Sequence, residues 1–240
     1  MSVATYFLSK DCFVCHAQDY WIILNTKRDR YLCVTHADLM SIGSCLHGWE
    51  GHTTGIDSSV QPFGSSDGLV ESLISNGIIT VDRNEGKPFA ESGFPIRESA
   101  IQIPRHLGTA GIPFLCVARF FLACARVDWR LRRKELSCTL AGIECRRRRT
   151  GPSGAYHDVA CNSMLIAIFK ELRPFYPRAY LCLFDSLALI EFLASYSFFP
   201  KIIFGVISDP FQAHCWVQDG SVVLNDNLER VEKYQPILSV

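Results

Sequence analysis

Two regions of the chain differ in the spacing of their apolar residues. Before residue 35, apolar positions come in short alternating runs separated by polar turns, which is the pattern of β-strands. These runs are TYFLS, DYWIILN and RYLCV, with the polar segment 25–30 between the last two. From Phe114 onward, apolar residues recur every three or four positions, which is typical of helices. The pattern therefore predicts a β-rich first part followed by a largely helical one.

Two short helices are predicted after the N-terminal strands. Thr35 is a suitable N-cap for a helix over HADLMSIGSCL, because its hydroxyl can accept a hydrogen bond from the first turn. Asp67 can cap a second helix, GLVESLISN, and Gly77 suits the left-handed residue that ends it. Residues 78–81 are expected to form a short strand or an extended exit. Three strands and small helices within residues 1–82 predict a winged-helix-like domain.

Residues 83–113 are predicted to be a linker, because glycine and proline recur there without a period. The domain boundary is expected inside it, and a second domain is expected over 114–240. The helices predicted there span 114–131, about 135–146, about 157–172 and about 182–197, and the strands span 201–207, 213–218 and 221–225. The expected fold class is α+β.

Composition narrows the class of protein. With 240 residues, 48% of them hydrophobic, the chain can bury a substantial core, and its formal net charge of zero gives no general indication of nucleic-acid binding. The longest apolar stretch, 112–125, contains Arg119 and is too short to span a membrane. The eleven cysteines are an odd number at irregular spacings, and the first residues do not follow the pattern of a signal peptide. We therefore expect reduced thiols and a cytoplasmic protein.

Three further patterns have an ordinary structural interpretation. The segment 12–16 fits the haem-attachment motif CxxCH, but its alternation favours buried strand cysteines with an exposed histidine. His157 and Cys161 are one helical turn apart, yet no second pair with zinc spacing follows, so no metal site is predicted. The run 146–149 consists of four arginines and is expected to be a solvated helix end. A docking surface for an acidic partner protein is the alternative for that run.

Cys182, His214 and Asp226 form a candidate Cys-His-Asp hydrolase site. Cys182 begins a predicted helix, whose free N–H groups lower the pKa of a thiol and can bind an oxyanion. His214 lies in one predicted strand, and Asp226 ends the next. In such a site the thiolate attacks, the imidazole transfers the proton and the carboxylate orients the imidazole.

The orienting residue depends on the register of the hairpin between these two strands. A two-residue turn at Asp219-Gly220 sets His214 opposite Asn225. A three-residue loop with a bulge at Gly220 shifts the register by one and places Asp226 on the face of His214. The residues permit both registers, and a Cys-His-Asn site would also function.

The segments around these residues resemble the transglutaminase-like leader peptidases of lasso-peptide biosynthesis. Residues 180–189, YLCLFDSLAL, are similar to the Cys motif of that family, residues 210–217, PFQAHCWV, to its His motif, and residues 223–226, VLND, to the strand that ends in its Asp. The resemblance implies that Cys182 is the nucleophile, His214 the general base and Asp226 its orienter, which favours the bulged register. Cys215 departs from the family pattern and is assigned no role.

The resemblance also implies a substrate and partners. Such B proteins bind a ribosomally made lasso precursor peptide, remove its leader and leave the core peptide to an ATP-dependent lasso cyclase. The papain/transglutaminase-like chemistry needs no metal or organic cofactor, although some members depend on the cyclase or on ATP for full activity. The alternatives are a non-catalytic carrier that presents the core to the cyclase, and an acyl transferase that passes the thioester to an amine.

Leader binding is expected at the strand over residues 31–34. An extended peptide can add to the edge of a sheet through main-chain hydrogen bonds, while side-chain pockets supply selectivity. The helix over 68–76 is expected to line those pockets. The residues predicted to contact the leader are Tyr31, Leu32, Cys33, Val34, Leu69, Leu73 and Ile74.

Overall fold

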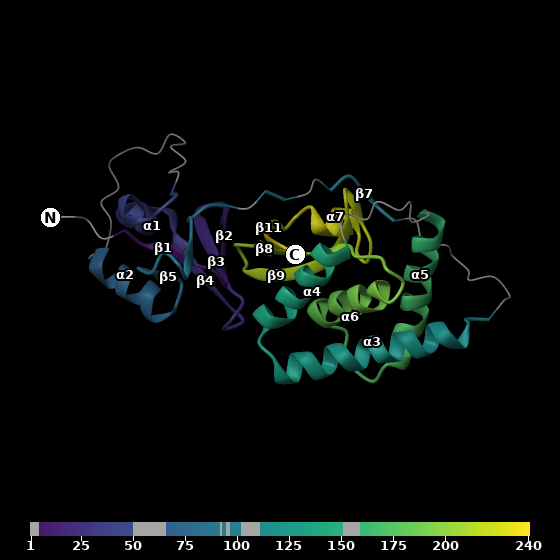
Figure 1. The fold of residues 1–240 in the computed structure, drawn as a ribbon. Coiled ribbons are helices and arrows are strands. Elements are labelled where there is room, and N and C mark those ends of the chain that lie inside the picture. Colours follow the sequence, from purple (N-terminus) through teal and green to yellow (C-terminus); the bar gives the residue numbers. More distant parts are fainter. Residues whose placement is uncertain (1–4, 50–65, 92, 95–96, 102–110, 151–158) are drawn as a thin grey trace. The chain divides into compact units, whose positions relative to one another are not determined.

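The computed structural model describes residues 5–49, 66–91, 93–94, 97–101, 111–150 and 159–240. The chain divides into two compact units, whose elements are labelled in Figure 1. Unit 1 comprises Met1–Gly93 together with Val206–Gln212, and unit 2 comprises Phe94–Gly205 together with Ala213–Val240. The first change from one unit to the other falls inside the range predicted as a linker.

Unit 1 contains two antiparallel sheets of three strands each. One has the order β2-β3-β4, formed by β2 (Cys12–Ala17), β3 (Tyr20–Asn25) and β4 (Arg30–Thr35). The other has the order β5-β1-β6, formed by β1 (Phe7–Ser9), β5 (Ile79–Thr80) and β6 (Gly86–Lys87). Strand β4 therefore lies at an edge of its sheet.

Of the two N-caps predicted in unit 1, Thr35 caps its helix, whereas Asp67 lies inside a helix that begins at Ser66. Helix α1 (His36–Ile42) is followed by a 3-10 turn (Gly43–Cys45), and the Thr35 hydroxyl accepts a hydrogen bond from the Asp38 N–H at 3.1 Å. Helix α2 (Ser66–Ser75) is followed by Gly77, whose φ of 66° is the left-handed conformation expected of it. The side chain of Asp67, the predicted cap, lies outside the described part.

The prediction of a three-stranded N-terminal module is incomplete. Strand β2 pairs along its full length with β3, and β6 comes from the range that we predicted to be a linker. Gly86 allows β6 to approach β1, because a Cβ at that position would overlap the Phe7 side chain. Phe89, also in the predicted linker, is 1% exposed in the core of unit 1. Absence of periodicity therefore does not separate a linker from short strands held by tertiary contacts.

Unit 2 combines helices with a five-stranded sheet of order β11-β8-β9-β10-β7. The helices are α3 (Phe114–Arg133), α4 (Leu136–Thr150), α5 (Val159–Leu172), α6 (Cys182–Ala194) and α7 (Leu228–Val231), with a 3-10 turn at Arg173–Phe175. The strands are β7 (Ser99–Ala100), β8 (Lys201–Ile207), β9 (Gln212–Asp219), β10 (Val222–Val223) and β11 (Gln235–Ser239). The sequence does not predict β7, β11 or α7.

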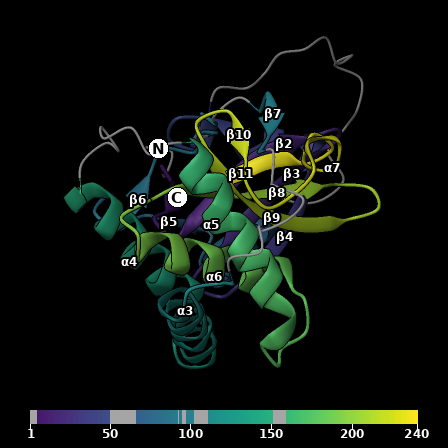
Figure 2. The same cartoon turned by 90° about the vertical axis from the view of Figure 1, so that its right-hand side faces the viewer.

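Helix α6 is the centre of unit 2. Nine of its residues are buried, from Phe184 to Leu193, and α3 and α5 both pack against it (Figure 2). Phe192 of α6 meets Phe120 of α3 and Phe169 of α5, with ring centroids 6.4 and 5.8 Å away. A helix that is apolar on all sides is typical of a buried position. The first residue of α6, Cys182, is nevertheless exposed.

The hairpin of β9 and β10 adopts neither of the two registers considered from the sequence. Asp219 pairs with Val222, so the turn consists of Gly220 and Ser221, and Gly220 has a φ of 54° that suits a tight turn. Strand β10 then ends at Val223 instead of extending to residue 225. Asp226 therefore lies beyond the ladder, where its position is set by side-chain contacts and not by strand parity.

Candidate active site

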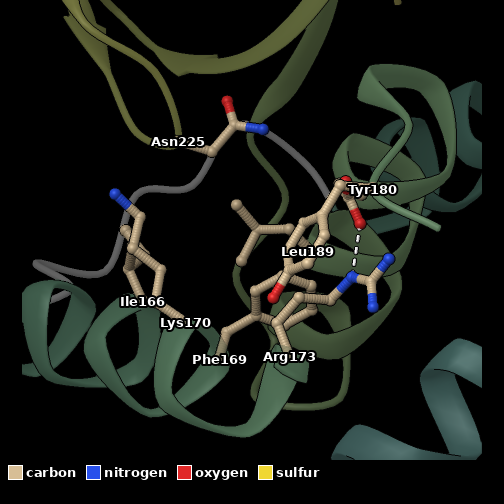
Figure 3. Close-up of a pocket in the computed structure, with 8 residues that line it drawn as sticks. Ile166, Phe169, Lys170, Arg173, Tyr180, Leu189 and Asn225 are labelled. Atoms are coloured by element: carbon tan, nitrogen blue, oxygen red, sulfur yellow. Dashed lines mark hydrogen bonds and ion pairs between the residues drawn. The ribbon is translucent and has the colours of Figure 1, made fainter. Parts of the chain in front are cut away.

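Cys182 is held in place by a buried arginine. The Arg173 guanidinium, on a residue that is 4% exposed, donates from Nε to Asp185 Oδ1 at 2.5 Å (Figure 3) and from Nη2 to the carbonyl oxygens of Arg178 and Ala179. Asp185 Oδ2 in turn accepts the Leu181 N–H at 3.0 Å. The segment before α6 is thus fixed from both ends, which sets the direction in which the helix presents Cys182.

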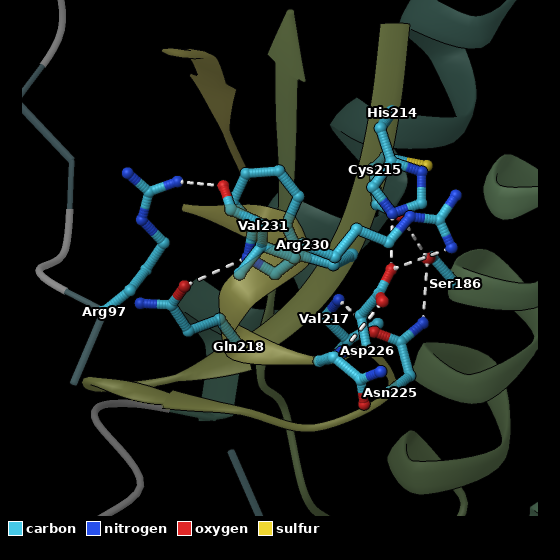
Figure 4. A network of polar contacts seen from close by, with 12 residues as sticks. Arg97, Ser186, His214, Cys215, Val217, Gln218, Asn225, Asp226, Arg230 and Val231 are labelled. Atoms are coloured by element: carbon cyan, nitrogen blue, oxygen red, sulfur yellow. Dashed lines mark hydrogen bonds and ion pairs between the residues drawn. The ribbon is translucent and has the colours of Figure 1, made fainter. Parts of the chain in front are cut away.

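His214 lies in β9, an interior strand of the sheet, and is 7% exposed. Its Nε2 is 2.5 Å from Asp226 Oδ2 (Figure 4). The other oxygen of Asp226 accepts the Asn227 N–H at 2.8 Å, which fixes the carboxylate plane. With Nε2 held in this way, Nδ1 is the ring nitrogen left for the Cys182 thiol.

Asn225 makes different contacts from those of Asp226. Its Oδ1 accepts the Val217 N–H at 2.7 Å, and its Nδ2 donates to Ser186 Oγ at 3.0 Å (Figure 4). Ser186 Oγ donates to the Cys215 carbonyl oxygen at 3.2 Å. Asn225 therefore links β9 to α6, and the residue hydrogen-bonded to His214 is Asp226.

The electrostatics of the site favour a charged thiol. Hydrogen bonds from the Cys215 thiol and then from His214 outweigh burial and lower the pKa of Cys182 to about 4. Burial lowers the pKa of His214, but hydrogen bonds to Asp226 and Cys182 outweigh it and raise this pKa to about 9. The pKa of Asp226 is lowered because, against burial, its hydrogen bond with His214 favours the carboxylate. Between about pH 4 and about pH 9, Cys182 is therefore a thiolate and His214 is an imidazolium.

The sequence analysis missed the contribution of Cys215. Its thiol is buried, and its hydrogen bond to Cys182 together with burial raises its own pKa well above the ordinary value. It therefore stays protonated and acts as a donor to the Cys182 thiolate. Ser186, Arg173 and Asp185 were also missed. Ser186 and Asp185 lie within the quoted Cys motif, where their spacing from Cys182 placed them on the first turns of α6.

The comparison with protein families agrees with this arrangement. Residues 121–239 match the model described as Transglutaminase-like superfamily. Residues 121–239 are a transglutaminase-like domain. This superfamily contains cysteine-dependent enzymes, both peptidases and transglutaminases, so the match fits a cysteine peptidase or an acyl transferase. No curated protein and no solved structure matches the chain.

The transglutaminase-like domain also contains a buried ionic cluster in the middle of α6. The Glu191 side chain is 5% exposed and binds Arg146 of α4 through two hydrogen bonds of 2.7 and 3.0 Å. Arg130 of α3 donates to the same carboxylate at 2.9 Å. Arg147 and Arg148 pair with Glu144 on their own helix. The arginine run that we expected to be a solvated helix end is therefore solvated only in part, because Arg146 points to a buried partner.

The residues predicted to contact a leader lie in unit 1 and differ in accessibility. Val34 and Leu73 are 6% and 0% exposed, and both belong to the core together with the partly buried Leu32 and Leu69. Their side chains pack inside the unit and cannot line a pocket for a peptide. Cys33 and Ile74 are exposed, and Tyr31 is half-buried.

The side of β4 that faces away from β3 carries main-chain groups. The His36 N–H donates to the Asp19 carbonyl at 3.0 Å, which marks this pair as hydrogen-bonded in the β3–β4 ladder. Hydrogen-bonded and non-hydrogen-bonded pairs alternate along antiparallel strands. The backbone N–H of Cys33 therefore points away from β3.

The remaining sequence patterns have structural roles or fall outside the described residues. Cys12 and Cys15 of the CxxCH segment are both 0% exposed on β2, and burial raises their pKa values to about 12. His16 is half-buried, not exposed as expected. His157 and the side chain of Cys161 are outside the described part. No helix among the described residues is long and apolar enough to cross a membrane.

Proposed function

We propose that this chain is the leader peptidase of a lasso-peptide pathway, binding a ribosomally made precursor and hydrolysing the bond between leader and core. The observation that carries the proposal is the grouping of Cys182, His214 and Asp226 in a transglutaminase-like domain, with pKa values that favour a thiolate and an imidazolium. The motifs around the three residues support the choice of substrate.

In the acylation step, the Cys182 thiolate attacks the carbonyl carbon of the scissile bond. The resulting oxyanion can accept a hydrogen bond from the Cys182 backbone N–H. This N–H has no partner within α6, because it belongs to the first turn of the helix. The His214 imidazolium then gives its proton to the leaving nitrogen, and the core peptide departs with a free amine. The leader stays bound to Cys182 as a thioester.

In the second step, neutral His214 takes a proton from water as the water attacks the thioester. The leader leaves with a new carboxylate, and the site returns to thiolate and imidazolium. Asp226 holds the ring in the orientation that both steps need and stabilises its charged form. If an amine reaches the thioester before water, the same site performs acyl transfer instead.

In unit 1, the proposal assigns leader binding to the outward-facing edge of β4. An extended leader would form main-chain hydrogen bonds at Cys33, adding one strand to the β2-β3-β4 sheet. The buried side chains of Leu32, Val34, Leu69 and Leu73 support this edge from within and do not touch the peptide. Ile74 remains a possible side-chain contact on α2, because it is 44% exposed.

The test uses a lasso precursor peptide encoded beside the gene for this chain. The precursor is incubated with the protein and with Cys182→Ala, with and without the cyclase and ATP, and the products are identified by mass spectrometry. Leader and core fragments whose masses add up to that of the precursor plus one water support a peptidase. A leader joined to an added amine identifies an acyl transferase. Equal function of Cys182→Ala in maturation would identify a carrier and overturn the proposal.

A further inference from the structure

A pocket of about 200 Å³ in unit 2 borders the candidate active site (Figure 3). Asp185, one helical turn after Cys182, lines one part of it, and Asn225, which precedes Asp226, lines another. Ligand pockets for whole small molecules usually measure 300 Å³ or more. The size and position of this pocket therefore suit one side chain of a peptide whose backbone lies at Cys182.

The floor of the pocket is apolar. Phe169 of α5, 5% exposed, lies at this floor, and Ile166 of α5 and Leu189 of α6, each 0% exposed, pack behind it. These side chains belong to the packed interface of two helices, so the floor is preformed. An occupant with methylene groups would bury them there.

The charges of the groups that line the pocket do not sum to zero. Arg173 and Asp185 neutralise each other, and the remaining donors of Arg173 are used by carbonyl oxygens of the segment before α6. Lys170 of α5 has no carboxylate at ion-pair distance among the residues that the structure describes. The more distant Asp226 raises the pKa of Lys170, but by less than burial lowers it. In Figure 3 Lys170 and Arg173 stand on opposite sides of the pocket. The pocket thus has one uncompensated cation.

Lys170 supplies the charge of the pocket and remains accessible to a ligand. Its side chain is exposed, and burial of part of it lowers its pKa. An ion pair with an exposed lysine contributes little by itself. The apolar floor and this cation together would therefore set the preference of the pocket.

We propose that this pocket receives an acidic side chain, Glu or Asp, of the substrate peptide near the scissile bond. Its methylene groups lie on the apolar floor at Phe169, and its carboxylate pairs with the Lys170 ammonium. The proposal rests on the proposed peptidase function and adds a preference for substrate charge. Lys170 is a specificity-determining residue in this scheme and takes no part in the chemical steps.

The test is a charge scan of the precursor. Each of the three residues on either side of the cleaved bond is replaced in turn by Glu, Gln and Lys, and kcat/KM is measured for the wild type, Lys170→Ala and Lys170→Glu. Lys233→Ala, which removes an exposed lysine elsewhere in unit 2, is the matched control. Modification of Cys182 by iodoacetamide is followed in every variant to show that the thiolate site is intact.

At one scanned position, we expect the wild type and Lys233→Ala to prefer Glu over Gln by roughly two- to fivefold, which is the range of an ion pair with an exposed lysine. Lys170→Ala should remove this preference, and Lys170→Glu should favour the Lys peptide at the same position. Unchanged charge preferences at all six positions would overturn the proposal. An equal loss of kcat for all peptides would also overturn it, because it would assign Lys170 to the support of Asp226. Failure of the wild type to cleave any peptide would instead refute the peptidase function itself.

Discussion

Replacement of Asp226 by Asn tests the ion pair at the candidate active site. The change keeps the size of the side chain but removes the carboxylate 2.5 Å from His214 Nε2. A hydrogen bond between charged groups contributes about 1.5–3 kcal/mol, and 1.36 kcal/mol corresponds to one unit of pKa. The variant should therefore lower the pKa of His214 from about 9 to roughly 7–8. Cleavage should slow by about a hundredfold or more, because the imidazole also loses its orientation.

Two measurements separate these effects. The pKa of His214 is read from the pH dependence of its ring signals in NMR spectra, and a His214→Ala variant identifies those signals among the seven histidines. Thiolate formation at Cys182 is read from the rate of iodoacetamide alkylation between pH 3 and 10. In the wild type this rate should rise as the pH increases through about 4 and stay high, because the thiolate is the reactive form.

In Asp226→Asn the alkylation rate should still rise near the same acidic pH, because His214 is protonated there in both proteins. Only the pKa of His214, measured as the midpoint of the pH dependence of its NMR signals, should change. Asp209→Asn, which makes the same charge change in the exposed turn between β8 and β9, serves as the control and should leave both readings unchanged. A His214 midpoint near 9 in Asp226→Asn would refute the assignment of Asp226 as its partner.

Four further outcomes follow from the same contacts. Iodoacetamide at pH 5 should modify the wild type once and Cys182→Ala not at all, since the lowered pKa makes Cys182 a thiolate at this pH; mass spectrometry counts the labels. Cys215→Ala should shift the acidic rise in alkylation of Cys182 to a pH above 4, because the thiolate loses its first donor; an unshifted curve would remove that role. Asn225→Ala should lower the free energy of unfolding by about 2 kcal/mol for two lost hydrogen bonds while the pKa of His214 stays near 9, measured by urea unfolding and NMR. Cys33→Pro should weaken leader binding by deleting an outward N–H, whereas Cys33→Ala should not, and titration of a labelled leader would show whether the donor or the side chain matters.

The periodic parts of the fold could be predicted from the sequence, while the short elements could not. Helices α3 to α6 and strand β8 follow from apolar spacing and capping residues, and their bounds agree within a few residues. The two-residue strands β6 and β7 exist only because they pair with β1 and β10, which are distant in sequence. Such pairing leaves no local pattern, so these residues looked like a linker.

The same limit applies to the candidate site. Helix-start and strand patterns, together with motif resemblance, indicated the three residues that the structure groups. The sequence did not decide which residue forms a hydrogen bond with His214. Strand parity was the only evidence for it, and Asp226 lies past the end of β10, where parity does not apply. The hydrogen bond between Asn225 and Ser186 holds the segment that follows β10, and it joins residues 39 positions apart in the sequence. The role of Cys215 was missed for a similar reason, since its thiol meets Cys182 only in the folded domain.

Glu191 determines how helix α6 is rotated about its own axis. Most of the buried residues of α6 are apolar and lie on several sides of the helix, so their packing alone distinguishes weakly between rotational positions. Rotation of α6 about its axis by one residue position, about 100°, would move the Glu191 carboxylate away from Arg130 and Arg146 and into an apolar environment. The free-energy cost would be several kcal/mol. The ion pairs of Glu191, more than two helical turns from Cys182, thus help to hold the rotation of α6 in which its first residue faces β9, together with the contacts of Asp185 and Ser186.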